Sequence, residues 1–158
     1  MINMSEYSSL YYGNDFALAE KFRNRVYSEL TNNAAYKDTM INKIDDLMEL
    51  CHSISAGCGW WQNNKGHALF RNFGEVIALI HSELSEALEG DRKQKQDDHL
   101  PQYTSVEVEL ADALIRIFDL AGAMDLRLGD AFVDKLVYNM NRSDHKIENR
   151  MAEGGKKY

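Results

Sequence analysis

The sequence has little of several features that mark particular protein classes. Among 158 residues it has one proline, Pro101, and two cysteines, Cys51 and Cys58. With one proline and ten glycines, little in the chain interrupts helices. Two cysteines seven residues apart form neither a disulfide framework nor the ligand pattern of a zinc site. We therefore expect a reducing, cytoplasmic setting.

Long apolar runs and positive charge are also scarce. No apolar stretch approaches the roughly 18 to 20 residues that span a membrane, and residues 1–10 lack the basic and apolar regions of a signal peptide. The 25 acidic and 18 basic residues leave a net charge of −7, which argues against a broad nucleic-acid surface. We expect neither a membrane nor a nucleic acid as partner. A phosphorylated small molecule stays compatible, because local basic residues and metal ions can offset the charge.

Helical periodicity is what the sequence does contain. Hydrophobic residues make up 44% of the chain, enough for a real core, and they do not alternate as in strands. Thr104-x-x-Glu107 is a capping box, which predicts a helix start at that point. The periodicity predicts an all-α protein with helices at about residues 15–30, 36–56, 72–89, 104–122 and 130–144.

Two pairs of carboxylates at helical spacing are the most informative pattern. Glu83-x-x-Glu86 lies in the third expected helix, and Glu109-x-x-Asp112 lies in the fourth, after a polar loop. Side chains three apart share one face of a helix. On adjacent helices the two pairs would bring four carboxylates together, and hard divalent cations relieve the resulting repulsion. The pattern predicts metal-assisted phosphate chemistry.

Glu83 is the acid that departs most clearly from an ordinary solvated face. Its neighbours at i−7, i−4, i−3 and i+4 are Val76, Leu79, Ile80 and Ala87, all apolar. Burying an unpaired carboxylate is costly, so Glu83 needs a metal or a basic partner. On the fourth helix the polar stripe is less specific, because it could simply face water; its members are Glu109, Asp112, Arg116 and Asp119.

Basic and aromatic candidates complete the list. Lys135, Asn139 and Arg142 recur at i, i+4 and i+7 on the fifth helix, which suits phosphate oxygens but also a surface salt-bridge face. Trp60 and Trp61 lie in a loop between glycines and asparagines. We expect one indole to stack on a nucleobase and the other to pack into the core.

The acidic motif resembles a known family signature. E-x-x-E followed by E-x-x-D is similar to the motif of the all-α NTP pyrophosphohydrolases, the MazG-like superfamily, and resembles its small single-domain phage and bacterial members. The resemblance covers roughly residues 40–158. The other stretches that carry it are Phe73-Gly74-Glu75 through Leu88, Glu109-Leu110-Ala111-Asp112 through Gly122, Lys135-x-x-Tyr138-Asn139-x-x-Arg142 and the Gly-Gly-Lys-Lys-Tyr end.

The resemblance implies a fold, an oligomer and a location. It implies an antiparallel helical bundle whose four-helix core is completed by oligomerisation into a homotetramer or dimer, in a bacterial or infected-host cytoplasm. Residues 1–36 would be a helical extension, and residues 37–158 the pyrophosphohydrolase domain with a mobile basic tail. Relatives often carry a histidine just before the final Gly-Gly, where this chain has Glu153, so the resemblance assigns the tail no role.

The resemblance also implies a reaction. A (deoxy)nucleoside triphosphate would be hydrolysed to the monophosphate and pyrophosphate with Mg²⁺, or Mn²⁺ as a substitute, adjusting the dNTP pool with a lean toward dGTP. His52 lies nine residues before Trp61, a spacing similar to that of base-contacting residues in some relatives. The implied metal ligands are Glu83, Glu86, Glu109 and Asp112, with Glu83 or Glu86 as general base. The implied phosphate-binding residues are Lys135, Asn139, Arg142 and Arg116, although Arg116 could instead hold the acids in place. The implied base-binding residues are His52, Trp60 and Trp61.

Two other readings stay open at this point. A ferritin-like di-iron bundle needs two Glu-x-x-His motifs, and only Glu49-Leu50-Cys51-His52 fits that pattern. The other alternative is a non-catalytic helical interaction module whose acidic residues are all solvated. Metal binding and hydrolysis would separate these readings from the enzyme.

Overall fold

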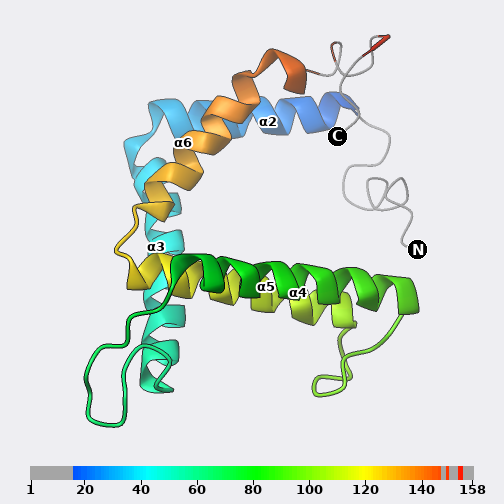
Figure 1. Cartoon of the computed structure of the whole chain (residues 1–158). Coiled ribbons are helices and arrows are strands. Elements are labelled where there is room, and N and C mark those ends of the chain that lie inside the picture. Colours follow the sequence, from blue (N-terminus) through cyan, green and yellow to red (C-terminus); the bar gives the residue numbers. More distant parts are fainter. Residues whose placement is uncertain (1–15, 147–148, 150–152, 155–158) are drawn as a thin grey trace. The chain divides into compact units, whose positions relative to one another are not determined.

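The described part of the chain is helical. The computed structural model describes residues 16–146, 149 and 153–154, and within them there is no strand, only the isolated bridges Gln62–Ala68 and Gln96–Thr104. The expected all-α class is confirmed for these residues, whereas the first 15 residues of the expected extension and most of the expected tail lie outside them. The elements are α2 (Phe16–Asn32), α3 (Ala34–Gly57), α4 (Phe73–Lys93), α5 (Ser105–Ala123), α6 (Leu128–Asn141) and the 3₁₀ turn η1 (Ser143–His145) (Figure 1).

The described residues form two compact units. One comprises Asp46–Leu126, with the second half of α3, α4 and α5. The other comprises residues 16–45 and 127–146, with α2, the first part of α3 and α6. In the second unit α2 packs against α6, and the first turns of α3 belong to the same unit. The expected extension over residues 1–36 and domain over residues 37–158 stay predictions. The type of helical bundle and its oligomeric state stay predictions.

The helix boundaries agree with the periodicity except at two ends. α4 continues to Lys93, four residues beyond the expected end. Gly90 does not end the helix. A Cβ at this position would lie 2.8 Å from Ser105 Oγ, so the glycine allows α4 and the start of α5 to pack closely. Glu89 pairs with Arg92 and Lys93 over the extra turn, and these local pairs support helix continuation.

α6 is shorter than expected at its C-terminal end. The helix ends at Asn141 rather than near Asp144, since Arg142 adopts an extended conformation with φ −63° and ψ 133°. Its guanidinium pairs with Asp144, and the chain then forms η1. A local side-chain pair thus competes with the last helical turn, which periodicity alone does not reveal.

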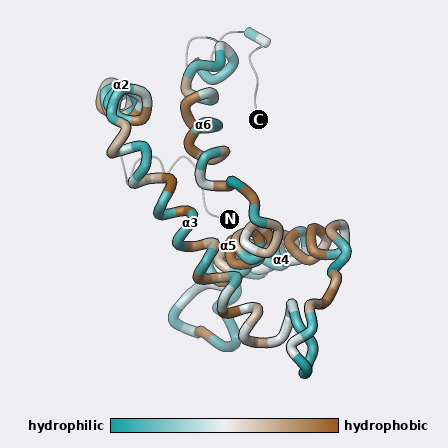
Figure 2. The backbone as a smooth tube through the Cα atoms, turned by 90° about the vertical axis from the view of Figure 1, so that its left-hand side faces the viewer, coloured by the Kyte–Doolittle hydropathy of each residue, from teal (hydrophilic) through white to brown (hydrophobic). Residues whose placement is uncertain are grey.

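The first unit is built on a helical hairpin of α4 and α5. The two helices run side by side in Figure 1, and apolar residues recur along both in Figure 2. The predicted capping box begins α5: Thr104 N–H donates to Glu107 at 2.7 Å, and Glu107 N–H donates to Thr104 Oγ1 at 3.3 Å. The buried core contains Val76, Ile80 and Leu120. This hairpin places both acidic motifs on facing helices.

The second half of α3 crosses α5 closely within the same unit. A Cβ at Gly122 would lie 2.7 Å from His52 Cβ and 3.0 Å from Met48 O. Only glycine fits so close a crossing, because any side chain would push the helices apart. The contact holds His52 and the end of α3 against α5.

The second unit packs α2, α3 and α6 through polar as well as apolar contacts. Val133 on α6 is almost fully buried, and Lys37 Nζ pairs with Asp134 Oδ1 at 2.8 Å. Asn141 donates to the Tyr27 hydroxyl at 3.0 Å. These contacts connect α2 and the start of α3 to α6 within this unit.

Candidate functional site

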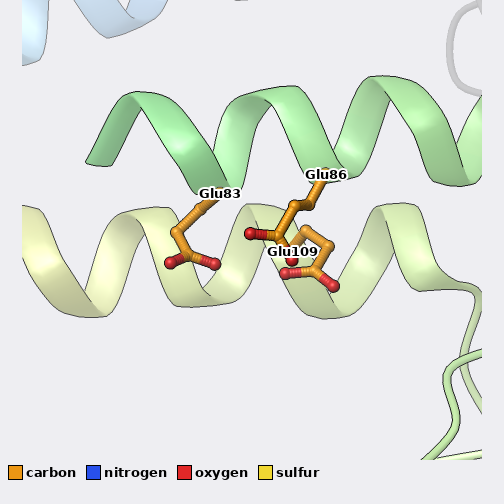
Figure 3. A group of neighbouring side chains, drawn as sticks. All are labelled: Glu83, Glu86 and Glu109. Atoms are coloured by element: carbon orange, nitrogen blue, oxygen red, sulfur yellow. The ribbon is translucent and has the colours of Figure 1, made fainter. Parts of the chain in front are cut away.

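Three of the four predicted acidic ligands meet between α4 and α5. Carboxylate oxygens of Glu83, Glu86 and Glu109 lie within 4.8 Å of one another. Figure 3 shows Glu83 and Glu86 extending from α4 toward α5, from which Glu109 extends. Glu83 is buried, at 6% exposure, as its apolar neighbours predict, while Glu109 is half-buried and Glu86 is exposed. The helical spacing of each pair and the pairing of α4 with α5 together produce the cluster.

The negative charges of the cluster perturb one another. Burial raises the pKa of Glu109, and the charge of Glu86 and a hydrogen bond with Glu83 raise it further. Burial also raises the pKa of Asp112, as does the charge of Glu83, while Arg116 opposes the rise. Burial is thus the main cause of both raised pKa values, with neighbouring like charge adding to it, and a bound cation would offset both effects.

Arg116 is the basic group that accompanies the cluster. Its Nε lies 2.7 Å from Glu83 Oε1, which is an ion-pair distance. The Nε–H does not point at that oxygen, so this buried nitrogen has no hydrogen-bond partner in the described part of the chain. The pair is therefore electrostatic without the aligned hydrogen bond that makes a guanidinium–carboxylate contact strong. One partly engaged arginine does not balance three carboxylates.

Asp112 is the predicted ligand that stands apart. It does not join the group of oxygens within 4.8 Å, although it is close enough for the charge of Glu83 to act on its pKa. Asp112 instead lines a pocket of about 540 Å³ in the same unit, together with Arg116. It therefore lies between the acidic cluster and that pocket.

Two of the three predicted phosphate-binding residues at the C-terminal part of α6 already contact other side chains of the second unit. Lys135 Nζ lies 4.6 Å from the centre of the Tyr138 ring, and the Arg142 guanidinium is held by Asp144. The third residue, Asn139, has a buried side-chain oxygen, Oδ1, that accepts no hydrogen bond from the described residues. A buried, unsatisfied amide oxygen is unusual in a folded protein.

Asp119 organises the far end of the pocket. Its Oδ1 accepts hydrogen bonds from His52 Nδ1 at 2.9 Å and from Trp61 Nε1 at 2.7 Å. Its Oδ2 accepts from Ser55 Oγ at 2.8 Å. Asp119 is a buried residue, so its carboxylate needs hydrogen-bond donors from the protein, and these three side chains provide them. The two predicted base-contacting residues His52 and Trp61 are thus joined through one acid.

The two tryptophans differ in burial, and the expected stacking of one on a nucleobase stays a prediction. Trp61 is half-buried and packs against the core, and its ring meets the His52 ring edge-on at 5.7 Å. Trp60 is 62% exposed and lines the pocket. The Arg71 guanidinium lies over both indoles, at 5.9 Å from Trp60 and 5.3 Å from Trp61, which is the geometry of a cation–π contact.

The pocket combines apolar walls with a few polar groups. Its walls come from the second half of α3 and from α5, with Trp60 and Arg71 from the connecting loop. The volume of about 540 Å³ falls within the range of small-molecule sites. The pocket-lining residues are Leu47, Leu50, Cys51, Ile54, Ser55, Cys58, Trp60, Arg71, Asp112, Ile115, Arg116 and Asp119.

Sequence reasoning missed three polar residues of this pocket: Asp119, Ser55 and Arg71. Asp119 was visible only as a member of the polar stripe on α5, seven residues after Asp112. That spacing is itself a signal, because seven residues complete two helical turns and return to the same face. Ser55 and Arg71 carry no comparable signal, since their place depends on how α3 and the loop pack.

Comparison with family models, with curated proteins and with solved structures finds no match to this chain. The resemblance to the MazG-like pyrophosphohydrolases therefore rests on the residues of the chain itself. Among the described residues, none of the helices is both long enough and apolar enough to cross a membrane.

Proposed function

We propose that the chain hydrolyses a (deoxy)nucleoside triphosphate to the monophosphate and pyrophosphate with Mg²⁺ or Mn²⁺. The observation that carries the proposal is the convergence of Glu83, Glu86 and Glu109 beside a pocket lined by Asp112 and Arg116. An acidic cluster next to a partly apolar pocket suits a ligand with a phosphate end and an aromatic end. On the strength of the family resemblance, the proposal includes a cytoplasmic role in adjusting the dNTP pool.

The donor set fits a hard divalent cation. Carboxylate oxygens are the protein ligands that Mg²⁺ prefers, and it also takes substrate phosphates. Glu83, Glu86 and Glu109 would hold it, with Asp112 reaching in from the pocket side. The bound cation would neutralise triphosphate charge and lower the pKa of a water. The raised pKa values of Glu109 and Asp112 support this fit, because burial and neighbouring acids both disfavour their ionised forms and a cation would favour them.

The residues of the chain position the substrate around the scissile bond. Arg116 lines the pocket beside Asp112 and can donate to phosphate oxygens with the guanidinium nitrogens other than Nε. Lys135, Asn139 and Arg142 are proposed as further phosphate-binding residues on the strength of the motif. Trp60, exposed at the pocket wall, offers its face to a base.

Glu83 or Glu86 is the proposed general base. Water loses a proton to the carboxylate as its oxygen attacks phosphorus, the bridging P–O bond breaks, and pyrophosphate or the monophosphate leaves as an anion. Glu86 is exposed and free to meet an incoming water, whereas Glu83 is already in contact with Arg116. Hydrolysis in ¹⁸O-water tells which phosphorus is attacked, because the label enters the monophosphate or the pyrophosphate.

A homo-oligomer, dimer or tetramer, completes the proposal. The α4–α5 hairpin leaves large apolar side chains in contact with solvent, and burying such a face is the usual reason for association. Light scattering coupled to gel filtration tests the state directly, and a monomer would remove this part of the proposal. Four of the exposed side chains are Leu84, Leu88, Leu110 and Leu114.

The deciding experiment is a hydrolysis panel over the eight common NTPs and dNTPs. Each reaction is run with Mg²⁺, with Mn²⁺ and with chelator, and monophosphate, diphosphate, pyrophosphate and phosphate are separated. The double variant Glu83→Ala/Glu109→Ala is the matched control. Monophosphate plus pyrophosphate, lost in the control, supports the proposal.

Two other outcomes would overturn it. No turnover and no binding of millimolar Mg²⁺ or Mn²⁺ would favour a non-catalytic helical interaction module. Bound iron with oxidase activity would favour the ferritin-like reading.

A further inference from the structure

The acidic cluster lies next to a second, smaller pocket of the same unit. Glu86 and Glu109, two of its three members, line this pocket of about 170 Å³, which we call the small pocket. Its other lining residues are Glu89, Gly90, Lys93, Lys95 and Ser105. The pocket of about 540 Å³ is lined by Asp112, three residues after Glu109 on α5. The cluster therefore borders the small pocket directly and the larger pocket through Asp112.

The size and lining of the small pocket suit a compact ionic ligand. Its volume of about 170 Å³ is below the roughly 300–1,000 Å³ that is usual for sites of whole small molecules. The space suits one or two phosphate groups rather than a nucleoside. Apart from Gly90, every lining residue carries a charged group or a hydroxyl group.

Ser105 contributes a hydroxyl group that has no partner in the described part of the chain. The residue is 8% exposed and lines the small pocket, yet its side chain makes no hydrogen bond with a described residue. It is not needed to cap α5, because Thr104 does so. Buried polar side chains ordinarily have a hydrogen-bond partner. The Ser105 hydroxyl is therefore available to donate to an anion in this pocket.

Two lysines bring positive charge to the same pocket. Lys93 and Lys95 lie immediately before and after Gln94, which caps α4 in a left-handed conformation with φ 49°. The main chain of Lys95 is held on both sides, because its N–H donates to Gly90 O at 3.1 Å and its carbonyl accepts from Ser105 N–H at 2.9 Å. Only the Lys95 side chain therefore has to become ordered when a ligand binds.

Both lysines are paired with acids outside the cluster. Lys93 Nζ lies 2.8 Å from Glu89 Oε1, and Lys95 Nζ lies 2.5 Å from Asp98 Oδ2. All four side chains are at least 45% exposed, and exposed pairs of this kind contribute little. A phosphate oxygen can therefore replace either carboxylate at small cost, since it is also a strong acceptor for an ammonium group.

From these residues we infer that the small pocket binds the terminal phosphates of the triphosphate and the pyrophosphate released from it. Lys93, Lys95 and the Ser105 hydroxyl donate to the phosphate oxygens. Glu86 and Glu109 would repel these phosphates, and the divalent cation that the two acids would hold offsets that repulsion. The inference rests on the proposed function: with the nucleoside in the larger pocket, the bond that breaks lies beside the acidic cluster.

Binding of the product tests the inference without any turnover. The full-length protein is titrated by calorimetry with pyrophosphate and with orthophosphate at saturating Mg²⁺. We expect Lys95→Met to weaken pyrophosphate binding about tenfold and Ser105→Ala about threefold, as for the loss of one charged and one neutral hydrogen bond. Lys95→Arg should keep most of the affinity, because it retains a charged donor. Lys43→Met is the matched control, since Lys43 is an exposed lysine of the second unit.

Asp98→Asn should change the affinity in the opposite direction. It removes the acid that holds Lys95, so pyrophosphate should bind about twofold more tightly. A gain in affinity cannot come from loss of folding, and circular dichroism checks the variants that lose affinity.

The outcomes separate this inference from the proposed function. Pyrophosphate affinity that is absent, or that is the same in the unmodified protein, Lys95→Met and Ser105→Ala, overturns the inference even if triphosphates are hydrolysed. Orthophosphate binding as tight as that of pyrophosphate also overturns it, because the small pocket would then recognise a single phosphate. Pyrophosphate binding that depends on Lys95, without hydrolysis of any triphosphate, supports the small pocket as a pyrophosphate site and overturns the proposed reaction.

Discussion

Both units carry exposed ion pairs, but among the described residues only the first unit also gathers several carboxylates in one place. In the second unit, charged side chains are paired one to one near the surface, as in Lys37–Asp134 and Arg127–Asp130. In the first unit, Glu83, Glu86 and Glu109 gather in one place with a single arginine among them. Exposed pairs of the first kind contribute little to folding. A concentration of like charge opposes folding, so its presence points to a ligand rather than to stability.

The largest expected effect comes from breaking the acidic cluster. Glu83→Gln removes a charge but keeps the shape, and we expect it to lower the turnover of the preferred triphosphate more than about 100-fold, because a metal ligand matters more than the residues that support it. Steady-state kinetics at saturating Mg²⁺ measure the loss.

The matched control is Asp134→Asn, the same kind of change in the second unit, which should leave turnover unchanged. Full activity of Glu83→Gln with metal bound would show that Glu83 is neither the base nor an essential ligand.

The next largest effect is a pH-dependent gain in stability from divalent cations. The pKa of Glu109 is raised above its ordinary value of 4.5, so this residue stabilises the fold fully below that pH. The contribution is lost as the pH rises through the folded-state pKa, and a bound cation restores it. We expect saturating Mg²⁺ or Mn²⁺ to raise the Tm by about 5 °C at pH 7.5.

At pH 5 the gain should be smaller, because protons compete with the cation for Glu109 and Asp112. Differential scanning fluorimetry with metal and with chelator at both pH values makes the measurement. An equal gain at both pH values, or an equal gain in Glu109→Gln, would place the cation elsewhere.

Two glycine-to-alanine substitutions, one in each unit, compare the effect of overpacking on stability and on ligand binding. Gly122 packs against His52 and Met48 in the first unit, and a Cβ at Gly129 would meet Asp45 Oδ1 at 2.5 Å in the second. Each substitution should cost about 1–3 kcal/mol of unfolding free energy through overpacking. Only Gly122→Ala should also weaken nucleotide binding, since it displaces His52, which donates to Asp119 in the pocket wall.

Chemical denaturation and calorimetry on both variants provide the two readouts. If Gly129→Ala weakens nucleotide binding as much as Gly122→Ala, the effect belongs to general loosening rather than to the pocket.

The smallest effect is expected at the surface pair of Lys37 and Asp134. Asp134 raises the pKa of Lys37 by hydrogen bonding and by charge, yet the pair is largely exposed, so screening by water and salt leaves it weak. Lys37→Met should shift the urea midpoint by no more than the error of the measurement. If Lys37→Met is clearly less stable than the unmodified protein even at high salt, the packing of α3 against α6 depends on this contact.

Periodicity was sufficient for the helices because they are long and strongly patterned. It also predicted the burial of Glu83, since an acid surrounded by apolar residues at helical spacing must lie on the packed face. The capping box of Thr104 and Glu107 marked the start of α5 for the same reason: the signal is local. The sequence alone could therefore predict those features that depend on residues close together in the chain.

Long-range packing determined what the sequence alone did not predict. Asp119 resembled an ordinary solvated acid, because its three donors come from α3 and from the loop, between 58 and 67 residues away in the chain. Asp112 was expected to join the other acids, but its position on α5 turns it toward the pocket. Such assignments depend on how helices cross, which no short window of sequence contains.

The α4–α5 connection has a consequence for how the chain can change in length. Ser105 N–H donates to Lys95 O at 2.9 Å, and Asp97 N–H donates to Tyr103 O at 3.1 Å, so the two sides of the loop are clasped at its base. Residues inserted at the tip, 98–102, would extend outward without altering the clasp. One residue inserted within α5 would turn everything after it by about 100°. We therefore expect insertions, including an engineered tag, to be tolerated at residues 98–102 but not within α5.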